Sequence, residues 1–384
     1  MANLNLAARL PALLLIPLLI PLLILGACAP RVAPPGPGLA ATGLTAPAFT
    51  EENFITADGT ELPLRHWAPR EGEAAARGVV LALHGFNDYS HAFAESGPAL
   101  AAQGLLVYAY DQRGFGEAPH RGLWAGVEVL TGDLAEAAAL LRRRHPGLPL
   151  YLLGESMGGA VILAALGGPD ARPEVSQADG VILAAPAVWA RSTMPFHQRA
   201  ALWLGARLFP WAKFTGRGLG IQASDNIEML RALGRDPLFI KETRTDAIYG
   251  LVNLMDAALA AAPEVKTPTL LLYGEKDEVV PAEPVFAFWR HLPPEAETRT
   301  PGRRRFALYP EGWHMLLRDL QAQVVIDDIA AWTGDRAAPL PSGAEETAAA
   351  ALKGAAEGGA EDGEKAGDGA EGDAAAAACE AAAC

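Results

Sequence analysis

The sequence predicts an α/β fold in which a mostly parallel sheet is covered by helices on both faces. Short apolar runs recur along the chain, each bounded by glycine, proline or aspartate, and segments with helical spacing separate them. Apolar strands that alternate with helices are typical of parallel sheets buried on both sides. Residues 188–245 break this rhythm with helical, Trp-rich and Arg-rich segments and no strand pattern, so we expect an insertion on top of the sheet there.

The predicted elements begin with a β-hairpin, Phe54–Thr56 and Leu62–Trp67, around the turn sequence Asp58-Gly59. Buried-strand patterns then recur in the apolar runs Val79–Leu83, Leu105–Tyr110, Leu150–Leu153, Val181–Ala184, Thr269–Tyr273 and Arg305–Tyr309. Helical stretches separate several of these runs, for example Ala92–Gln103, Gly132–Arg144 and Met157–Leu166. These patterns place the folded domain at residues 49–334.

Residues 1–27 have the pattern of a secretory signal peptide, with Arg9 and the free amine before an apolar run that ends at Leu25. The following Leu25-Gly26-Ala27-Cys28 resembles the lipobox of bacterial lipoproteins, in which the cysteine is acylated and becomes the mature N-terminus. We therefore expect lipidation at Cys28 and attachment to the bacterial cell envelope, at the outer membrane if the source is Gram-negative. A transmembrane helix and an ordinary cleaved signal peptide are the alternatives, although the run is shorter than the ~20 residues that span a bilayer.

Both flanks of the domain have biased compositions. Residues 28–48 are rich in proline and glycine, which is typical of a tether. Residues 335–384 are almost entirely alanine, glycine, glutamate and aspartate. They offer too few large apolar side chains to offset the entropy of ordering, so we expect a disordered tail. Its cysteines, Cys379 and Cys384, can close a local disulfide in an oxidising compartment.

The composition excludes some classes of function. The 384-residue chain has a formal net charge of −14, and no segment concentrates lysine and arginine, which argues against nucleic acid as a partner. Its three cysteines all lie outside residues 49–334, so the domain has no cysteine-based metal site or disulfide framework. We expect neither a metal nor an organic cofactor, and no pattern specifies an oligomeric state.

One motif predicts a catalytic nucleophile. Gly154-Glu155-Ser156-Met157-Gly158 fits the pattern G-x-S-x-G, directly after the apolar run Leu150–Leu153 and before a helical segment. A nucleophile elbow needs this strand–turn–helix setting, because small flanking residues allow the serine to project from a tight turn. A plain glycine-rich turn is the alternative, but the setting favours Ser156 as the nucleophile.

Partners for this serine follow later strands. A serine hydroxyl needs a base to accept its proton, and in this architecture the order along the chain is serine, acid, histidine. Asp277 comes just after the run Thr269–Tyr273, and His314 comes just after Arg305–Tyr309. We expect His314 to transfer the proton and Asp277 to hold the tautomer of its imidazole.

An oxyanion needs preorganised donors, typically two backbone N–H groups. Met157 supplies one N–H by its position after the serine, and Phe86, in His84-Gly85-Phe86, supplies the natural second. We expect His84 itself to be structural. The glycine-rich segment that begins at Asp111 lacks the Lys-Ser/Thr of a phosphate-binding loop, so we interpret it as a tight turn.

Together these motifs resemble the α/β-hydrolase family, in its bacterial branch of monoacylglycerol lipase-like and lysophospholipase-like enzymes, from about Phe49 to Trp332. The resemblance implies an α/β-hydrolase fold with a helical cap at residues 188–245. It also implies hydrolysis of a lipid carboxylic ester through an acyl-enzyme. After His84-Gly85 the chain departs from animal members, which bears on the substrate more than on the chemistry. The segments that carry the resemblance are His84-Gly-Phe, Asp111-Gln-Arg-Gly-Phe-Gly, Gly154-Glu-Ser-Met-Gly-Gly, Gly274-Glu-Lys-Asp and Gly312-Trp-His.

Two other functions stay open. A serine aminopeptidase shares this triad order and a cap, and it would use acidic cap residues to bind a free amine; the candidates are Glu228, Asp236, Glu242 and Asp246. A non-catalytic envelope lipoprotein of the same fold is the other alternative. Haloalkane dehalogenases and epoxide hydrolases are disfavoured, because they would have aspartate where Ser156 stands.

Within the expected cap, residues 198–209 have helical spacing. Arg199, Trp203 and Arg207 recur four residues apart and so share one side of the helix. This pattern fits a solvated face better than an interfacial anchor for lipid headgroups, because a single Trp stripe is a weak membrane signal.

Overall fold

A computed structural model describes residues 30–70, 72, 75–216, 218, 220–294 and 304–362, with side chains as far as residue 355. Its centre is a 9-stranded sheet with the strand order β1-β2-β3-β5-β4-β6-β7-β10-β11. The strands of this sheet are β1 (Ala48–Phe49), β2 (Asn53–Ile55), β3 (Glu61–Trp67), β4 (Gly78–Leu83), β5 (Leu105–Tyr110), β6 (Leu150–Glu155), β7 (Gly180–Ala184), β10 (Thr269–Gly274) and β11 (Arg304–Tyr309).

The sheet is mostly parallel, as predicted. Strands β5, β4, β6, β7, β10 and β11 run parallel, and β3 pairs antiparallel with β5, so that Leu64 lies opposite Tyr110. Every predicted apolar run is a strand, and the predicted hairpin is β2 and β3. Its turn is possible because Gly59 adopts a φ of 77°, in the left-handed region that glycine enters without a steric penalty.

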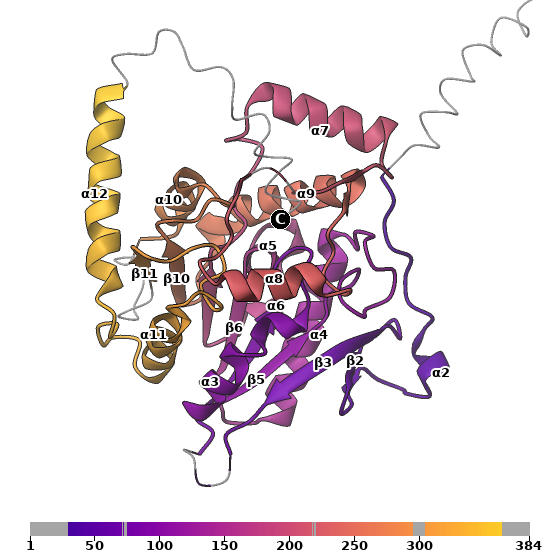
Figure 1. The fold of residues 1–384 in the computed structure, drawn as a ribbon. Helices are drawn as coiled ribbons and strands as arrows, with labels where there is room; N and C mark the ends of the chain where they lie inside the picture. The colour runs from indigo at the N-terminus through magenta and orange to yellow at the C-terminus, as the bar shows by residue number, and fades with distance from the viewer. Residues whose placement is uncertain are drawn as a thin grey trace, which may run out of the picture.

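Side chains alternate between two apolar cores, one on each face of the sheet. In β4, Val79, Leu81 and Leu83 belong to one core, and Val80 and Ala82 belong to the other. Figure 1 shows the resulting layers, with helices on both faces of the sheet. The first core is covered mainly by α4 (Val127–Arg144), α5 (Met157–Leu166), α9 (Thr245–Ala261) and α10 (Ala282–His291), and the second by α3 (Ser96–Ala102) and α11 (Ala322–Gly334).

The insertion above the sheet differs from the prediction in one respect. Its outermost helix, α7 (Phe196–Leu208), packs on α9 and lies at the top of Figure 1. The rest of the insertion contains α8 (Ile227–Arg235) and a two-stranded antiparallel sheet, β8 (Lys213–Phe214) with β9 (Thr243–Arg244). No strand was predicted there, because strands of this length are too short to produce an alternating pattern.

The C-terminal segment is ordered where the structure describes it, which corrects the prediction of a disordered tail from residue 335. Helix α12 (Ala344–Asp362) lies along β11, the edge strand of the sheet (Figure 1). Leu340, Ala344 and Ala348 are buried in this contact. Small alanine side chains let a helix approach the sheet closely, so the segment is held by tertiary packing that its composition does not reveal.

Polar contacts also hold this segment. The buried Asp328 accepts hydrogen bonds from the N–H of Ser342 at 3.0 Å and from its hydroxyl at 2.5 Å. Arg305, in β11, forms an ion pair of 2.8 Å with Glu345. Cys379 and Cys384 lie outside the described residues.

The described part of the predicted tether packs against the domain. The N–H of Ala33 donates to the carbonyl of Trp124 at 2.8 Å, and the N–H of Gly36 donates to Asp58 Oδ2 at 2.8 Å. A short helix, α2 (Leu39–Thr42), follows. Residues 1–27 and Cys28 lie outside the described residues. Among the helices that are described, none has the length and apolar character needed to cross a membrane.

Candidate active site

Ser156 occupies a strained turn between β6 and α5. Its backbone has a φ of 51° and a ψ of −112°, a left-handed φ that is unusual for any residue other than glycine. The flanking glycines are required by close packing: a Cβ on Gly154 would collide with the first turn of α5, and a Cβ on Gly158 would collide with the carbonyl of Leu83 in β4. The motif therefore forms the predicted elbow, which aims Ser156 away from the sheet.

Hydrogen bonds fix the elbow to the end of β7. The N–H of Ser156 donates to the carbonyl of Ala184 at 2.9 Å, and the carbonyl of Ser156 accepts from the N–H of Ala187 at 3.0 Å. Strain at a single residue persists only where its surroundings determine its conformation. These two bonds and the glycine contacts provide that support.

His314 and Asp277 lie together, as predicted, although they are far apart in sequence. The distance from His314 Nδ1 to Asp277 Oδ2 is 2.8 Å, and both side chains are buried. The other carboxylate oxygen of Asp277 accepts from the N–H groups of Val279 and Val280, at 2.8 and 2.9 Å. The carboxylate is therefore held in one orientation, and its bond to Nδ1 leaves Nε2 of His314 free to face a reacting group.

The Asp277 carboxylate determines the protonation of His314. Burial by itself lowers the pKa of the imidazole, but the adjacent negative charge and hydrogen bond of Asp277 favour the protonated form. The net effect raises the pKa of His314 above its usual value. This arrangement stabilises an imidazolium, the state that a histidine reaches after it accepts a proton from serine.

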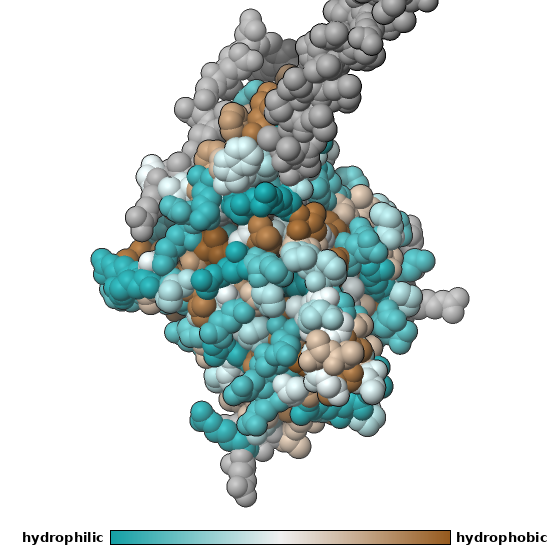
Figure 2. All heavy atoms as spheres, turned by 90° about the vertical axis from the view of Figure 1, so that its right-hand side faces the viewer, coloured by the Kyte–Doolittle hydropathy of each residue, from teal (hydrophilic) through white to brown (hydrophobic). Residues whose placement is uncertain are grey.

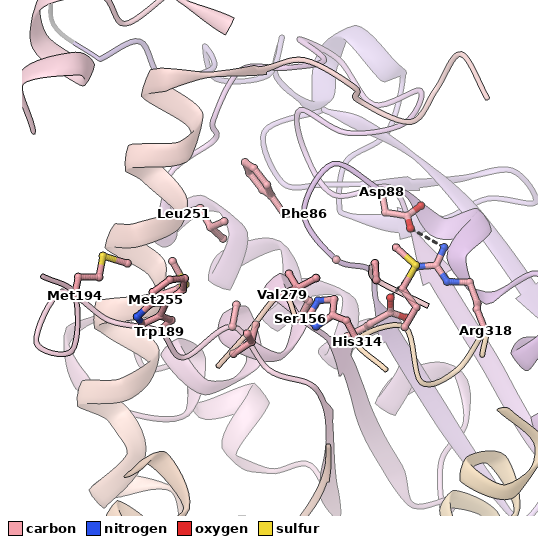
Figure 3. A pocket seen from close by; sticks show the side chains of 16 residues that line it. Phe86, Asp88, Ser156, Trp189, Met194, Leu251, Met255, Val279, His314 and Arg318 are labelled. Carbon is pink, nitrogen blue, oxygen red and sulfur yellow. Dashed lines mark hydrogen bonds and ion pairs between the residues drawn. The ribbon is translucent and has the colours of Figure 1, made fainter. Parts of the chain in front are cut away.

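Ser156 and His314 share an apolar pocket. Figure 3 shows this pocket, with Phe86 above Ser156 and His314 and a wall of apolar side chains to one side. That wall is formed by Trp189, Met194, Leu251 and Met255. The arrangement combines a candidate nucleophile and base with a surface that suits an acyl chain.

The predicted donors of the oxyanion hole flank the serine. Met157 is the first residue of α5, and the N–H groups of the first turn of a helix have no partner within that helix. Gly85 lies close to Ser156, since a Cβ on it would be 3.5 Å from the Cβ of the serine, and Phe86 follows it along the pocket. The ring of Phe86 packs edge to face on Phe115 at 5.5 Å, which fixes the conformation of this loop.

His84 and the turn after β5 are structural, as predicted. Nε2 of His84 accepts from the N–H of Gln112 at 2.9 Å, so its proton lies on Nδ1 and points to the carbonyl of Gly85. Burial lowers the pKa of His84, which keeps it neutral. In the turn, Asp111 accepts from the N–H groups of Ser90 and Glu117, both at 2.9 Å.

Sequence reasoning missed a buried ion-pair network beside the pocket. Arg318 lies 2.7 Å from Asp88 Oδ2 through Nη1 and 2.7 Å from Glu155 Oε1 through Nη2 (Figure 3). All three side chains are buried and line the pocket. Burial lowers the pKa of the Arg318 guanidinium, but the two carboxylates raise it overall, so the group stays charged. Asp88 and Glu155 are close in sequence to the predicted site residues, and a buried acidic side chain needs a basic partner. These two acidic residues were the sequence signal that could have indicated the network.

The acidic cap residues considered for an aminopeptidase have other roles. Asp246 is buried and paired with Arg244 at 2.6 Å, and Asp236 accepts from the hydroxyl of Tyr89 at 2.7 Å. Glu228 pairs with Arg231, and Glu242 lies 3.8 Å from Lys213. Of the described residues that line the pocket, none belongs to this set.

The strand order, the serine elbow and the two later loops define an α/β-hydrolase. The chain belongs to the family described as serine aminopeptidase, S33, which matches residues 74–321.

Individual proteins of known name are also similar to this chain. The chain is 25% identical to the monoglyceride lipase of Rattus norvegicus over 295 residues, which cover 74% of this chain and 91% of that protein. It is 26% identical to the monoacylglycerol lipase of Mycolicibacterium smegmatis over 302 residues, which cover 74% of this chain and 96% of that one. A solved structure of a soluble variant of monoglyceride lipase from Saccharomyces cerevisiae superposes with a TM-score of 0.61 at 21% identity, covering 77% and 97% of the two chains. That structural likeness shows the fold.

Proposed function

We propose that this protein is a serine hydrolase that cleaves carboxylic esters of lipids, of the monoacylglycerol or lysophospholipid type, through an acyl-enzyme. The observation that carries the proposal is the pairing of His314 with Asp277 next to Ser156 in an apolar pocket. The monoglyceride lipases among its relatives support the same class of substrate.

The geometry supports a two-step reaction. His314 Nε2 accepts the proton of Ser156 while Oγ attacks the ester carbonyl carbon, and the N–H groups of Phe86 and Met157 stabilise the oxyanion that forms. The C–O bond to the alcohol then breaks, and the imidazolium of His314 donates its proton to the departing oxygen. Water repeats the sequence on the acyl-enzyme, releases the fatty acid and restores Ser156. Asp277 holds the imidazole in the required tautomer and stabilises the imidazolium by its negative charge.

The same site supports an ester more than a peptide substrate with a free amine. A positively charged amine needs an unpaired carboxylate near the nucleophile. Asp88 and Glu155 line the pocket, but both carboxylates form ion pairs with Arg318. The apolar wall formed by Trp189, Met194, Leu251 and Met255 instead suits a hydrocarbon chain.

We further propose that Cys28 carries a lipid anchor that holds the enzyme at the cell envelope. The support is the sequence Leu25-Gly26-Ala27-Cys28. Two or more acyl chains give stable membrane attachment, because each buried CH₂ contributes about 0.8 kcal/mol. Such an anchor would keep the pocket near a supply of lipid esters.

The proposal on function is tested with Ser156→Ala and a matched control, Ser192→Ala, whose serine is exposed in the cap. The substrates are p-nitrophenyl esters, a monoacylglycerol, a lysophospholipid and aminoacyl anilides, and a fluorophosphonate probe reports the reactive serine. We expect Ser156→Ala to lose probe labelling and about 10⁶-fold in kcat. Ser192→Ala should match the wild type. Normal turnover by folded Ser156→Ala, or a preference for the anilides over the esters, would refute the proposal.

A further inference from the structure

The cap is hydrogen-bonded to the loop that carries His314. We define the cap seam as residues 222–226 of the cap together with residues 313–320 of that loop. The N–H of Met315, the residue directly after His314, donates to the carbonyl of Ala223 at 3.0 Å. Met315 and Ala223 both line the pocket. The cap therefore holds the backbone of the loop immediately beside the base.

The carboxylate of Asp319 makes a second link across the cap seam. Its Oδ1 accepts from the hydroxyl of Ser224, in the cap, at 2.6 Å, and its Oδ2 accepts from the N–H of Trp313 at 2.8 Å. Hydrophilic side chains cover much of the surface in Figure 2, whereas Asp319 is 5% exposed and Ser224 is fully buried. Because Trp313 directly precedes His314, this one carboxylate joins the cap to the backbone on the other side of the base.

Asp319 is ionised at neutral pH although it is buried. Burial raises the pKa of Asp319, and the hydrogen bonds from Ser224 and Trp313 lower it. The nearby charges of Asp225 and Glu155 raise the pKa further, to about 6 in all. An ionised carboxylate only accepts hydrogen bonds, which suits a group placed between two donors. A buried charge is costly unless it is hydrogen-bonded, so Asp319 favours the arrangement in which both donors stay in place.

The position of His314 depends on this backbone. The strand β11 ends at Tyr309 and α11 begins at Ala322, so His314 lies on the connection between them. Asp277 orients the imidazole ring, but a base must also lie within hydrogen-bond reach of the proton that it accepts. Connecting segments are more mobile than the elements that they join, and the cap seam holds the residues on both sides of His314.

We propose that Asp319 and Ser224 are positioning residues, which couple the cap to the base by holding Nε2 of His314 within reach of Ser156. Neither belongs to the described residues that line the pocket, so both act through His314 and not on the ester. Their loss should lower kcat more than it changes KM, because the wall that binds substrate remains while the geometry of proton transfer is lost. The kinetic part of this inference rests on the proposed function, whereas the position of His314 can be observed without it.

Four variants of the full chain test the proposal. Asp319→Ala removes both acceptors, and Ser224→Ala removes one donor. Asp319→Asn is the conservative rescue, because its Oδ1 can accept from Trp313 while its Nδ2 donates to the hydroxyl of Ser224. Asp225→Ala is the matched control: Asp225 Oδ1 accepts from the N–H of Leu320 at 2.9 Å, across the same seam but not next to the base.

Two measurements are made on each variant. The first is kcat and KM on a soluble p-nitrophenyl ester, with active sites counted by a fluorophosphonate. The second is the downfield proton resonance of His314 Nδ1–H, which is hydrogen-bonded to Asp277 and reports on the ring without any substrate. We expect Asp319→Ala to lose about 100-fold in kcat with little change in KM, and to broaden the resonance. Ser224→Ala should lose less, and Asp319→Asn and Asp225→Ala should resemble the wild type.

A wild-type kcat and a sharp resonance in folded Asp319→Ala would overturn the proposal, as would an equal loss of kcat in Asp225→Ala. A purely structural role predicts a lower Tm with kcat per active site unchanged. If Asp319→Ala does not fold, Ser224→Ala, which removes only a hydroxyl, decides by the same criteria. A wild-type protein that hydrolyses no ester would reject the proposed function alone, because the resonance of His314 still reports on the cap seam.

Discussion

The ion-pair network beside the pocket leads to predictions for the stability of the protein and for the pH dependence of its activity. Arg318 contacts Asp88 and Glu155 at 2.7 Å each, and all three side chains are buried. Replacement by methionine in Arg318→Met keeps much of the volume but leaves two buried carboxylates without their cation. Removing one partner of a buried ion pair typically costs 3–5 kcal/mol, so we expect Arg318→Met to lower Tm by roughly 5–10 °C.

The network also connects the three loops of the site. Its loss should therefore change the pH dependence of kcat as well as the stability. Asp88 follows Phe86, Glu155 precedes Ser156, and Arg318 follows His314. Glu155 raises the pKa of His314 and Arg318 lowers it. Hydrolysis needs neutral His314, so activity falls as the pH decreases through this pKa. Arg318→Met should therefore move the acidic limb of the kcat profile to higher pH, and Glu155→Gln should move it to lower pH.

The assay is kcat against pH on a soluble ester, together with urea unfolding of each variant. Arg318→Lys is the conservative control: it keeps the charge but cannot bridge two carboxylates with two N–H groups, so its acidic limb should stay close to that of the wild type. If the network has only a structural role, the substitutions should lower the free energy of unfolding and leave the acidic limb of the kcat profile unchanged. Limbs that move in the same direction in Arg318→Met and Glu155→Gln would refute the electrostatic reasoning.

Three further variants test other parts of the structure. Asp277→Asn should reduce kcat roughly 10⁴-fold with little change in substrate binding. It should also shift the acidic limb of the residual activity to lower pH, because Asp277 raises the pKa of His314. Unchanged activity in Asp277→Asn would mean that another carboxylate orients the base. Ala348→Asp places a carboxylate in the buried contact of α12 and should cost about 1–3 kcal/mol in urea unfolding, whereas Ala349→Asp, one residue along on the exposed face, should cost no more than about 0.7 kcal/mol. Equal losses would show that α12 does not dock. Cys28→Ser should release the protein from the membrane fraction without loss of activity on a soluble ester, and a variant that stays in the membrane with residues 1–27 attached would identify a transmembrane anchor.

The sequence was most informative where local patterns determine structure. The strands of a sheet buried on both faces must be apolar throughout, so runs such as Val79–Leu83 stand out without any knowledge of their neighbours. The elbow at Ser156 is equally local, because Gly154 and Gly158 are required by contacts within one turn and with the adjacent strand. The pairing of Asp277 with His314 was predictable only because parallel strands bring their carboxyl ends to one edge.

Features that depend on distant partners were not predictable in the same way. The Arg318 network joins residues that are far apart in the chain, and no spacing rule connects them. Helix α12 looked too poor in large apolar residues to be ordered, because its stability depends on the edge strand β11 that it covers. The N-terminal segment has the composition of a tether, yet Asp58 and Trp124 provide partners for its backbone.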